Sequence, residues 1–385
     1  MSEALSAVPE ITPAELVVAI ERGEALQIVD VRNPLRVAGG RIDLVPDGRF
    51  HNIVGSQLRA RSSLEGTGIA ADLPIVTVCG FGNDSRAVGA HFRSLGLDAR
   101  SLRGGMAAYM DTLIERPLDA PAGFDRVIQF DRIGKGALGY LLVSDGEALI
   151  VDPPRDPSAM LAAVRAAGAR LVAVADTHVH ADYVSGAAAL ARAHGVPYRL
   201  HPADAFDPFD GTPGKLALAP LANGVALALG RATLTALHTP GHTEGSTTLL
   251  AGDALALTGD FVFVESIGRP DLAGRADAWS EQLWASLERA KRDWPANLLV
   301  LPGHYSSGRE RRGDRSIAAP WGALLRDNAA LAMTDRAAFL AWARTPSAAP
   351  AAYRTIKRVN VGLVAVTPDE AIELEVGRNE CAMRT

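Results

Sequence analysis

Four apolar segments between residues 171 and 301 each lead into a histidine or an aspartate, and this repetition strongly constrains the fold. The segments are LVAVA, ATLTAL, ALALT and NLLVL, and each has the length and apolar content of a buried strand. An α/β scaffold gathers distant side chains at the ends of its strands. We therefore expect the polar residues that follow these strands to meet in one site.

The segment after LVAVA reads DTHVHADY and supplies His178, His180 and Asp182 at alternate positions. In an extended or tightly turning chain, alternate side chains point to one side, so these three can converge. Three further candidates follow the other strands, namely His242, Asp260 and His304. A single histidine near a strand end is usually a hydrogen-bonded structural residue, but six such groups at strand ends favour a metal site.

The length of 385 residues exceeds what one core normally supports, so two domains are expected. Strands predicted at 26–31, 74–78 and 99–102 alternate with a helix that starts at a capping box at Thr12 and with a helix near 85–95. This alternation predicts a small parallel α/β domain over residues 1–115. Proline and small residues mark a linker at 116–124.

Residues 125–385 form the second predicted domain, which is rich in sheet. It opens with an antiparallel hairpin, YLLVS and ALIVD, around the turn residues Asp145-Gly146-Glu147. Helices are predicted at 157–167, 185–194 and 279–291.

The net charge of −5 excludes the basic surface that nucleic acids and anionic membranes require, so a small-molecule substrate is expected. The first residues lack the features of a signal peptide, and no apolar run reaches the roughly 18 residues that span a bilayer. We expect a cytoplasmic protein without membrane association, and the sequence leaves a homo-oligomer open. The cysteines, Cys79 and Cys381, fall in different predicted domains, which argues against a structural disulfide.

Cys79 ends the strand PIVTV and precedes a predicted helix in VCGFGNDSR. Gly80 and Gly82 allow backbone N–H groups to turn toward the sulfur, and the helix start adds positive potential. Both effects favour a thiolate or a persulfide anion, so Cys79 is a candidate catalytic nucleophile. Cys381 is either a second sulfur relay or an inert thiol.

Two families resemble the two halves of the sequence. From about residue 125 the sequence resembles the metallo-β-lactamase fold, whose ligand signature is HxHxDH followed by a GH, a GD and a late GH, and this resemblance implies an αββα sandwich with a metal site along one edge. Residues 8–115 resemble rhodaneses, through the CxxGNDS form of the Cys79 loop, DVR at 30–32 and RGGM at 103–106.

Tyr183 departs from the metallo-β-lactamase pattern, because dinuclear hydrolases of that fold carry a histidine there as a ligand of the second metal. A neutral phenol is a poor ligand for a divalent metal. In persulfide dioxygenases of this fold the positions matching His178, His242 and Asp260 are the iron ligands. The resemblance thus implies one Fe(II) per chain, with zinc as the alternative, and it makes His180, Asp182 and His304 hydrogen-bond partners of the ligands or holders of a second metal.

The segment SIGRPDLAG resembles the GRxD segment of persulfide dioxygenases. Arg269 is therefore assigned to the substrate, since a guanidinium binds a carboxylate of a glutathione-like carrier through two parallel hydrogen bonds. The alternative is a loop ion pair between Arg269 and Asp271. Tyr183 is the second substrate-binding candidate.

These resemblances imply a persulfide dioxygenase (sulfur dioxygenase) that oxidises a small-thiol persulfide, such as glutathione persulfide, with O2 to sulfite and thiol. Cys79 would move sulfane sulfur to or from the carrier. Two alternatives stay open: a dinuclear zinc thioester hydrolase of the glyoxalase II type, and a non-catalytic sulfur carrier or persulfide sensor.

Overall fold

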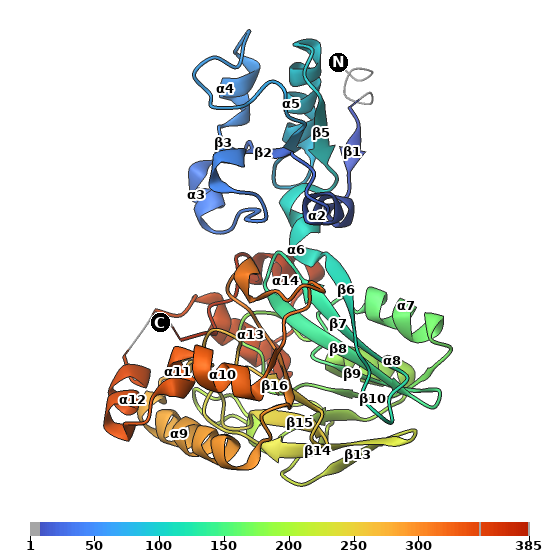
Figure 1. Ribbon diagram of the computed structural model, residues 1–385, viewed down its shortest axis with the longest axis vertical. Helices are drawn as coiled ribbons and strands as arrows, with labels where there is room; N and C mark the ends of the chain where they lie inside the picture. Colours follow the sequence, from blue (N-terminus) through green and yellow to red (C-terminus); the bar gives the residue numbers. More distant parts are fainter. Residues whose placement is uncertain (1–7, 346–347, 384–385) are drawn as a thin grey trace. The chain divides into compact units, whose positions relative to one another are not determined.

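The computed structural model describes residues 8–345 and 348–383. These residues cluster into two compact units. The smaller unit contains the chain up to Ile114 together with Arg132–Lys135 and Val376–Arg378, and the larger unit contains the rest. Both units are labelled by element in Figure 1.

The smaller unit is built on a five-stranded sheet in which every neighbouring pair of strands is parallel. Its strand order is β1 (Glu10–Ile11), β5 (Ala99–Leu102), β4 (Ile75–Val78), β2 (Gln27–Asp30) and β3 (Phe50–Asn52). The helices are α2 (Pro13–Glu21), α3 (Pro34–Ala38), α4 (Gly55–Arg59), α5 (Asn83–Ser94) and α6 (Gly105–Asp111). The predicted small parallel α/β fold is confirmed.

Helix α2 begins where the capping box predicts. The Thr12 hydroxyl accepts a hydrogen bond from the Glu15 N–H at 3.2 Å, and the Glu15 carboxylate accepts one from the Thr12 N–H at 2.8 Å. Pro13 occupies the first turn, where a missing N–H costs nothing. Local sequence therefore fixes the start of this helix.

The larger unit contains two sheets. The first, in strand order, is β12 (Ala219–Pro220), β11 (Tyr198–Leu200), β10 (Arg170–Ala175), β9 (Glu147–Val151), β8 (Ala137–Ser144), β7 (Arg126–Arg132) and β6 (Leu113–Leu118). The second is β13 (Ala226–Leu229), β14 (Ala232–His238), β15 (Thr247–Ala251), β16 (Leu255–Gly259), β17 (Leu299–Pro302) and β18 (Ala319–Pro320). The predicted hairpin is β8 and β9, which pair antiparallel around the positive-φ residues Asp145 and Gly146.

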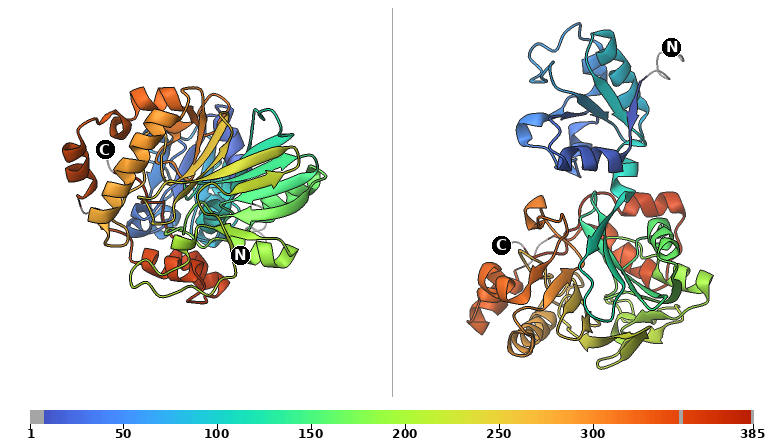
Figure 2. Two further views of the ribbon diagram at one scale, coloured as in Figure 1. Left: turned by 90° about the horizontal axis from the view of Figure 1, so that it is seen from below. Right: turned by 45° about the vertical axis from the view of Figure 1, so that its right-hand side comes forward.

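The two sheets pack face to face, because alternate residues of their strands enter one shared core. Leu255 and Leu257 of β16 lie in this core with residues of β8 and β9, whereas Ala256 between them joins Leu283 and Leu287 of α9 (Ala276–Asp293). Helices α7 (Ser158–Ala166) and α8 (Ala187–His194) cover the first sheet. The layers are visible in both views of Figure 2, and they confirm the predicted αββα sandwich.

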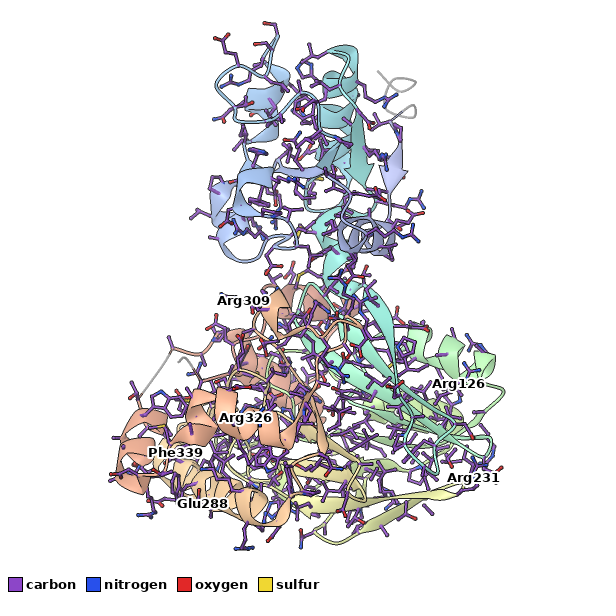
Figure 3. The ribbon with its side chains drawn as sticks, in the orientation of Figure 1. Arg126, Arg231, Glu288, Arg309, Arg326 and Phe339 are labelled. Carbon is purple, nitrogen blue, oxygen red and sulfur yellow. The ribbon has the colours of Figure 1, made fainter. Side chains whose placement is uncertain are left out.

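Among the described residues after β18 lie five helices that the sequence pattern did not predict. They are α10 (Trp321–Asp327), α11 (Ala329–Ala332), α12 (Arg336–Ala343), α13 (Ala352–Asn360) and α14 (Pro368–Leu374). Phe339 of α12 is buried and packs on Trp284 of α9 with ring centroids 5.0 Å apart, whereas Arg326 and Glu288 point outward (Figure 3). Within the described part of the chain, no helix combines the length and apolar content that crossing a bilayer requires.

The predicted linker at 116–124 needs a correction, because residues 116–118 belong to strand β6. Ile114, Arg116 and Leu118 are buried, while Glu115 and Pro117 between them are exposed. This alternation is that of a half-buried strand. Proline is tolerated here because β6 is the edge strand of its sheet.

Candidate metal centre and Cys79 loop

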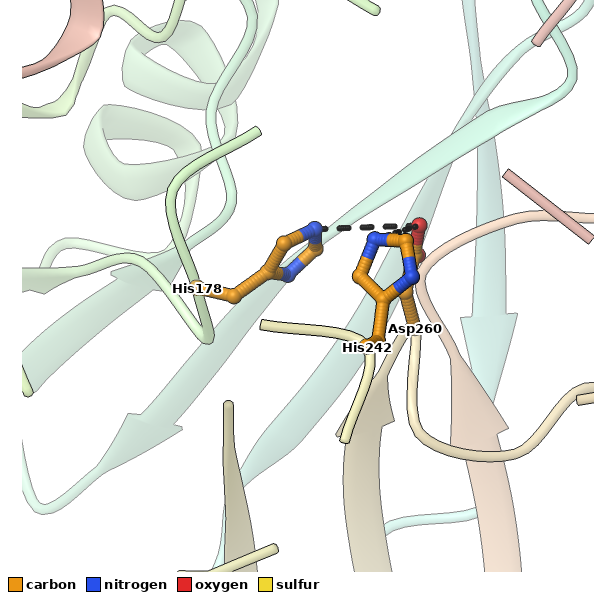
Figure 4. A group of neighbouring side chains, drawn as sticks. All are labelled: His178, His242 and Asp260. Atoms are coloured by element: carbon orange, nitrogen blue, oxygen red, sulfur yellow. Dashed lines mark ion pairs between the residues drawn. The ribbon is translucent and has the colours of Figure 1, made fainter. Parts of the chain in front are cut away.

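The ends of three strands of the larger unit bring His178, His242 and Asp260 together. His178 follows β10, His242 follows β14 and Asp260 follows β16. The Nε2 atoms of His178 and His242 lie 3.7 and 3.4 Å from Oδ2 of Asp260 (Figure 4). All three side chains are at most 2% exposed, so the cluster is enclosed.

Two glycines allow this close approach. Gly259 precedes Asp260 with a φ of +52°, and a Cβ there would lie 2.3 Å from Oγ1 of Thr177. A Cβ on Gly303, which precedes His304, would lie 2.7 Å from Oδ1 of Asp260. Side chains at either position would push the loops apart, which explains the glycine before each of these polar residues.

The atoms that face one another in the cluster are buried without hydrogen bonds. Among the described residues, Nε2 of His178, Nε2 of His242 and Oδ2 of Asp260 have no hydrogen-bond partner. Buried polar atoms are rarely left unsatisfied in native proteins, and a bound ion would satisfy these. The three atoms together offer two imidazole nitrogens and one carboxylate oxygen to a metal.

The hydrogen bonds around the two histidines fix the tautomers that a metal needs. The Thr177 hydroxyl donates its proton to Asp152 at 2.9 Å, so it accepts from Nδ1–H of His178 at 3.0 Å. Nδ1–H of His242 donates to the Arg269 carbonyl at 2.9 Å. In both His178 and His242, Nε2 is therefore unprotonated, and its lone pair is free to bind a metal ion.

The charge state of the cluster also suits a divalent metal. Burial holds the pKa of His178 well below its usual value and lowers the pKa of His242 to about 4. Burial alone would raise the pKa of Asp260, but the positive charge of the neighbouring His304 lowers it below its usual value. Neutral imidazoles and an ionised carboxylate are the forms that bind metal, so these residues fit a metal ion.

His180 points to a different set of partners. Its Nε2 lies 3.1 Å from Oδ1 of Asp152 and 2.9 Å from Oη of Tyr183, and its ring stacks on Tyr183. Asp176 is a further neighbour, with Oδ1 at 3.7 Å. Sequence reasoning missed Asp152 and Asp176, although both directly follow strands and the strand-end pattern could have found them.

His304 and Asp182 lie on the other side of Asp260. Nδ1 of His304 is 2.6 Å from Oδ1 of Asp260, and its Nε2 is 3.0 Å from Oδ2 of Asp182. Burial alone would lower the pKa of His304, but the carboxylates of Asp182 and Asp260 raise it to about 10. His304 thus links the two carboxylates.

The substrate-binding candidates Tyr183 and Arg269 are both buried. Burial raises the pKa of Tyr183 well above its usual value, so the phenol stays neutral. Arg269 forms a two-bond ion pair with Asp271, with both contacts at 2.6 Å, which is the loop pair that the sequence left as the alternative. Arg269 also lines a cavity of about 580 Å³ together with residues of the C-terminal segment such as Glu380 and Met383.

Asp204 and Asn360 hold the loops of His178 and His242 in place. Oδ2 of Asp204 accepts from the Val179 N–H at 2.8 Å and from the Thr243 hydroxyl at 2.7 Å, which ties the loop of His178 to the loop of His242. Nδ2 of Asn360 in α13 donates to the carbonyls of His180 and Tyr183. Neither residue lies in a recognisable motif, so sequence carried no signal for them.

Cys79 lies in the smaller unit, between β4 and α5, and is 4% exposed. Its Sγ accepts from the Gly82 N–H at 3.1 Å and from the Ser85 hydroxyl at 3.3 Å. The RGGM segment packs on the same loop, because the Met106 N–H donates to the Cys79 carbonyl at 2.8 Å. The loop therefore presents one backbone and one side-chain donor to the sulfur.

Comparisons with known proteins find two different families in two separate parts of the chain. A family model described as "Metallo-beta-lactamase superfamily" matches residues 134–304, and one described as "Rhodanese-like domain" matches residues 12–112. An "Uncharacterized protein" of Aquifex aeolicus is 30% identical over 203 residues, which cover 48% of this chain and 94% of that protein.

Two further similarities concern a protein with a named activity and a solved structure. A "Hydroxyacylglutathione hydrolase" of Anaeromyxobacter dehalogenans is 36% identical over 175 residues, 45% of this chain, and the match spans 63% of the hydrolase, less than two thirds of its length. The crystal structure of a metallo-beta-lactamase from Staphylococcus aureus superposes with a TM-score of 0.54 and 26% identity, covering 63% of this chain and 73% of that chain.

Proposed function

This chain belongs to the metallo-beta-lactamase superfamily and carries a rhodanese-like domain before the matched region, and on that premise we propose that it is an iron-dependent persulfide dioxygenase. The substrate is the persulfide of a small thiol such as glutathione. One persulfide, one O2 and one water give the thiol, sulfite and two protons, so the terminal sulfur is oxidised while dioxygen is reduced.

The observation that carries the proposal is the group of three buried, unsatisfied atoms on His178, His242 and Asp260. Two imidazoles and one carboxylate are the ligand set of non-haem Fe(II) oxygenases, which leaves positions open for other groups. A bound ferrous ion would supply the redox chemistry with dioxygen. The contact between His180 and Tyr183 supports a single ion in this group, because it turns His180 toward a phenol.

The residues around the centre have roles of their own. Thr177 and the Arg269 carbonyl hold the rings of His178 and His242 in the metal-binding tautomer. Nδ1 of His304 bonds to Oδ1 of Asp260, which leaves Oδ2 of Asp260 for the ion. For a small-thiol persulfide, Arg269 is proposed to contact a carrier carboxylate from the wall of the cavity that it lines.

Cys79 is proposed to move sulfane sulfur. Its thiolate attacks the outer sulfur of thiosulfate, which gives a Cys79 persulfide and releases sulfite. A small thiolate then takes that sulfur and regenerates the Cys79 thiolate, and the reverse transfer is equally open. The Gly82 N–H and the Ser85 hydroxyl support this assignment, because both point at Sγ, where the transferred sulfur would be attached.

A second candidate function is a zinc thioester hydrolase. It is favoured by the 36% identity to a protein named hydroxyacylglutathione hydrolase. Such an enzyme would use a metal ion to generate hydroxide at neutral pH. The name of that relative also supports a glutathione-type carrier for either reaction.

Protein purified without oxygen separates the two candidates. We expect about one iron per chain, together with oxygen uptake and sulfite formation from glutathione persulfide. The matched control is His242→Ala, which should lose both iron and oxygen uptake. Two zinc ions per chain, with hydrolysis of S-lactoylglutathione and no oxygen uptake, would establish the hydrolase instead.

A further inference from the structure

Lys357 is a buried cation without a hydrogen-bond partner. Its side chain is fully buried, and among the described residues no group accepts a hydrogen bond from its Nζ. Lys135 is also buried, but its Nζ donates to the Gly377 carbonyl at 3.1 Å. Native proteins rarely bury an unpaired charge, because the lost hydration is costly. The ammonium of Lys357 therefore has N–H donors left for a group that does not belong to the chain.

Helix α13 holds Lys357 against the loops of the metal centre. The buried residues of this helix recur at helical spacing and form one face: Tyr353, Ile356, Lys357 and Asn360. Asn360, one turn after Lys357, donates to the His180 carbonyl at 3.0 Å. Tyr353, one turn before Lys357, packs in one cluster with Cys381. Lys357 thus lies between a contact to the metal-site loop and a contact to the C-terminal segment.

The groups around Lys357 favour a positive charge without accepting its hydrogen bonds. Nζ lies 5.6 Å from the centre of the Phe209 ring and 5.9 Å from that of Trp279, and the faces of aromatic rings attract cations. The carboxylates of Asp204 and Asp207 interact with Lys357 electrostatically, but they accept hydrogen bonds from other groups. Their donors are Val179, Thr243 and Gly245 for Asp204, and Phe209 and Arg358 for Asp207.

Lys357 also acts electrostatically on the metal centre. Its charge interacts with Cys381 and Arg269, and the Arg269 N–H donates to the Cys381 carbonyl at 2.9 Å. Burial is the main cause of the lowered pKa of His242, and the charge of Lys357 lowers that pKa further. Charges interact strongly where water is excluded. An anion at the centre would therefore be stabilised by Lys357.

We propose that Lys357 binds sulfite, the small oxyanion that forms in the reaction proposed above. The identity of the anion rests on that proposed function, whereas the site rests on the burial and the unused donors of Lys357. Sulfite is an anion at neutral pH, and its oxygens accept hydrogen bonds from an ammonium. Lysine suits a compact oxyanion because its charge is concentrated on one atom with three donors. Binding is non-covalent, so sulfite leaves unchanged and acts as an inhibitor when it accumulates.

NMR of the lysine side chains tests the site directly, because the chain has four lysines. The full-length protein carries nitrogen-15 in its lysines and zinc in place of iron, and the Nζ signals are recorded through the neighbouring CH2 groups. Sodium sulfite should shift the Lys357 signal and saturate it at one equivalent per chain, while the signals of Lys215 and Lys291 stay in place. Lys357→Met should bind sulfite roughly 10- to 100-fold more weakly by calorimetry. The matched control Lys215→Met, at an exposed position, should bind sulfite as the wild type does.

Three outcomes would overturn the proposal. A Lys357 signal that sulfite does not move shows that this ammonium does not bind the anion. Equal shifts of the Lys215 and Lys291 signals indicate an adventitious ion only. Sodium lactate is the second probe, because it offers a carboxylate of similar size, and a shift with lactate but none with sulfite rejects sulfite as the ligand. Since the titration uses the wild-type sequence, its result does not depend on the folding of Lys357→Met.

The titration needs no turnover, so its failure is distinguishable from a failure of the proposed function. Oxygen uptake with glutathione persulfide, but without sulfite binding, rejects the Lys357 site alone. Sulfite binding at Lys357 in a protein without oxygen uptake rejects the dioxygenase alone and leaves Lys357 as a site for small oxyanions.

Discussion

Oδ1 of Asp260 lies 2.6 Å from Nδ1 of His304. The other oxygen of the same carboxylate faces His178 and His242, at 3.7 and 3.4 Å. One side chain therefore connects the proposed iron site with a neighbouring histidine. The two oxygens have different partners, so substitutions on the two sides should have different effects on metal content.

Replacing His178, His242 or Asp260 by alanine should each remove the iron, because a site with three protein ligands has no spare ligand. Oxygen uptake with glutathione persulfide should disappear with the metal. Metal analysis of protein purified without oxygen measures the first effect, and an oxygen electrode measures the second. Retention of full iron content by any of the three variants would remove that residue from the ligand set.

His304→Ala should keep most of the iron, since His304 contacts Asp260 by a hydrogen bond and is not one of the three ligands. Loss of an orienting hydrogen bond typically lowers metal affinity by about 10- to 100-fold, so weakly held iron is expected on dialysis. The comparison is with His242→Ala under the same dialysis. Equal and complete loss of iron from both variants would mean that the mononuclear assignment is wrong and that the site is dinuclear.

Arg269→Ala should weaken binding of the carrier and leave the iron content unchanged. Loss of a charge-assisted contact should raise KM by roughly tenfold, and Arg269→Lys should restore binding only in part. Asp271→Asn is the matched control, because it removes the partner of the guanidinium and keeps Arg269. Unchanged KM in Arg269→Ala, with equal losses of thermal stability in both variants, would mean that the pair is structural only.

Because of Lys357, the free energy of unfolding of the larger unit should change with pH in the alkaline range. Its Nζ is buried and, among the described residues, has no hydrogen-bond partner. Burial lowers its pKa to about 8, whereas the unfolded chain has a lysine pKa near 10.4. Between these two pKa values Lys357 is protonated in the unfolded chain but not in the folded one. The free energy of unfolding therefore increases as the pH rises from about 8 to 10.

Lys357→Met removes this dependence and should be more stable than wild type by roughly 2 to 3 kcal/mol below pH 8, with the difference vanishing near pH 10.5. Urea unfolding followed by tryptophan fluorescence is suitable, because the five tryptophans all lie between residues 279 and 342. A difference between the variants that stays constant across this pH range would show that Lys357 does not titrate there.

The fold could be predicted from the sequence largely because its signals are local. The apolar segments of β10, β14, β16 and β17 are visible as such, and the structure places the residues that follow them side by side. The edge strand β6 was hidden by Pro117, which resembles a linker residue until its alternating burial is known. Helices α10 to α14 also went unpredicted.

The position of Cys381 could not be predicted, because nothing near it in the sequence encodes its surroundings. Its placement depends on main-chain hydrogen bonds with residues 267–269, more than a hundred positions earlier. Backbone pairing of this kind leaves no residue pattern. The same holds for Asn360, whose amide supports the loop of His180 from a helix late in the chain.

Cys79→Ser should separate the two proposed chemistries. Serine keeps the shape of the loop, in which Sγ accepts hydrogen bonds from the Gly82 N–H and the Ser85 hydroxyl. An unactivated hydroxyl cannot carry a persulfide at neutral pH, so transfer of sulfur from thiosulfate to a thiol should disappear. Oxygen consumption with preformed glutathione persulfide should continue at close to the wild-type rate, because His178, His242 and Asp260 are unchanged.

The two assays distinguish a small-molecule carrier from a protein-bound one. With the small carrier, the substrate reaches the metal site already charged with sulfur, and Cys79 is needed only to produce it. If Cys79→Ser abolished oxidation of preformed glutathione persulfide while iron content stayed normal, the obligate substrate would be the persulfide on Cys79 itself. The wild-type protein with thiosulfate and catalytic glutathione is the positive control, since it requires both steps and should show oxygen uptake that the variant lacks.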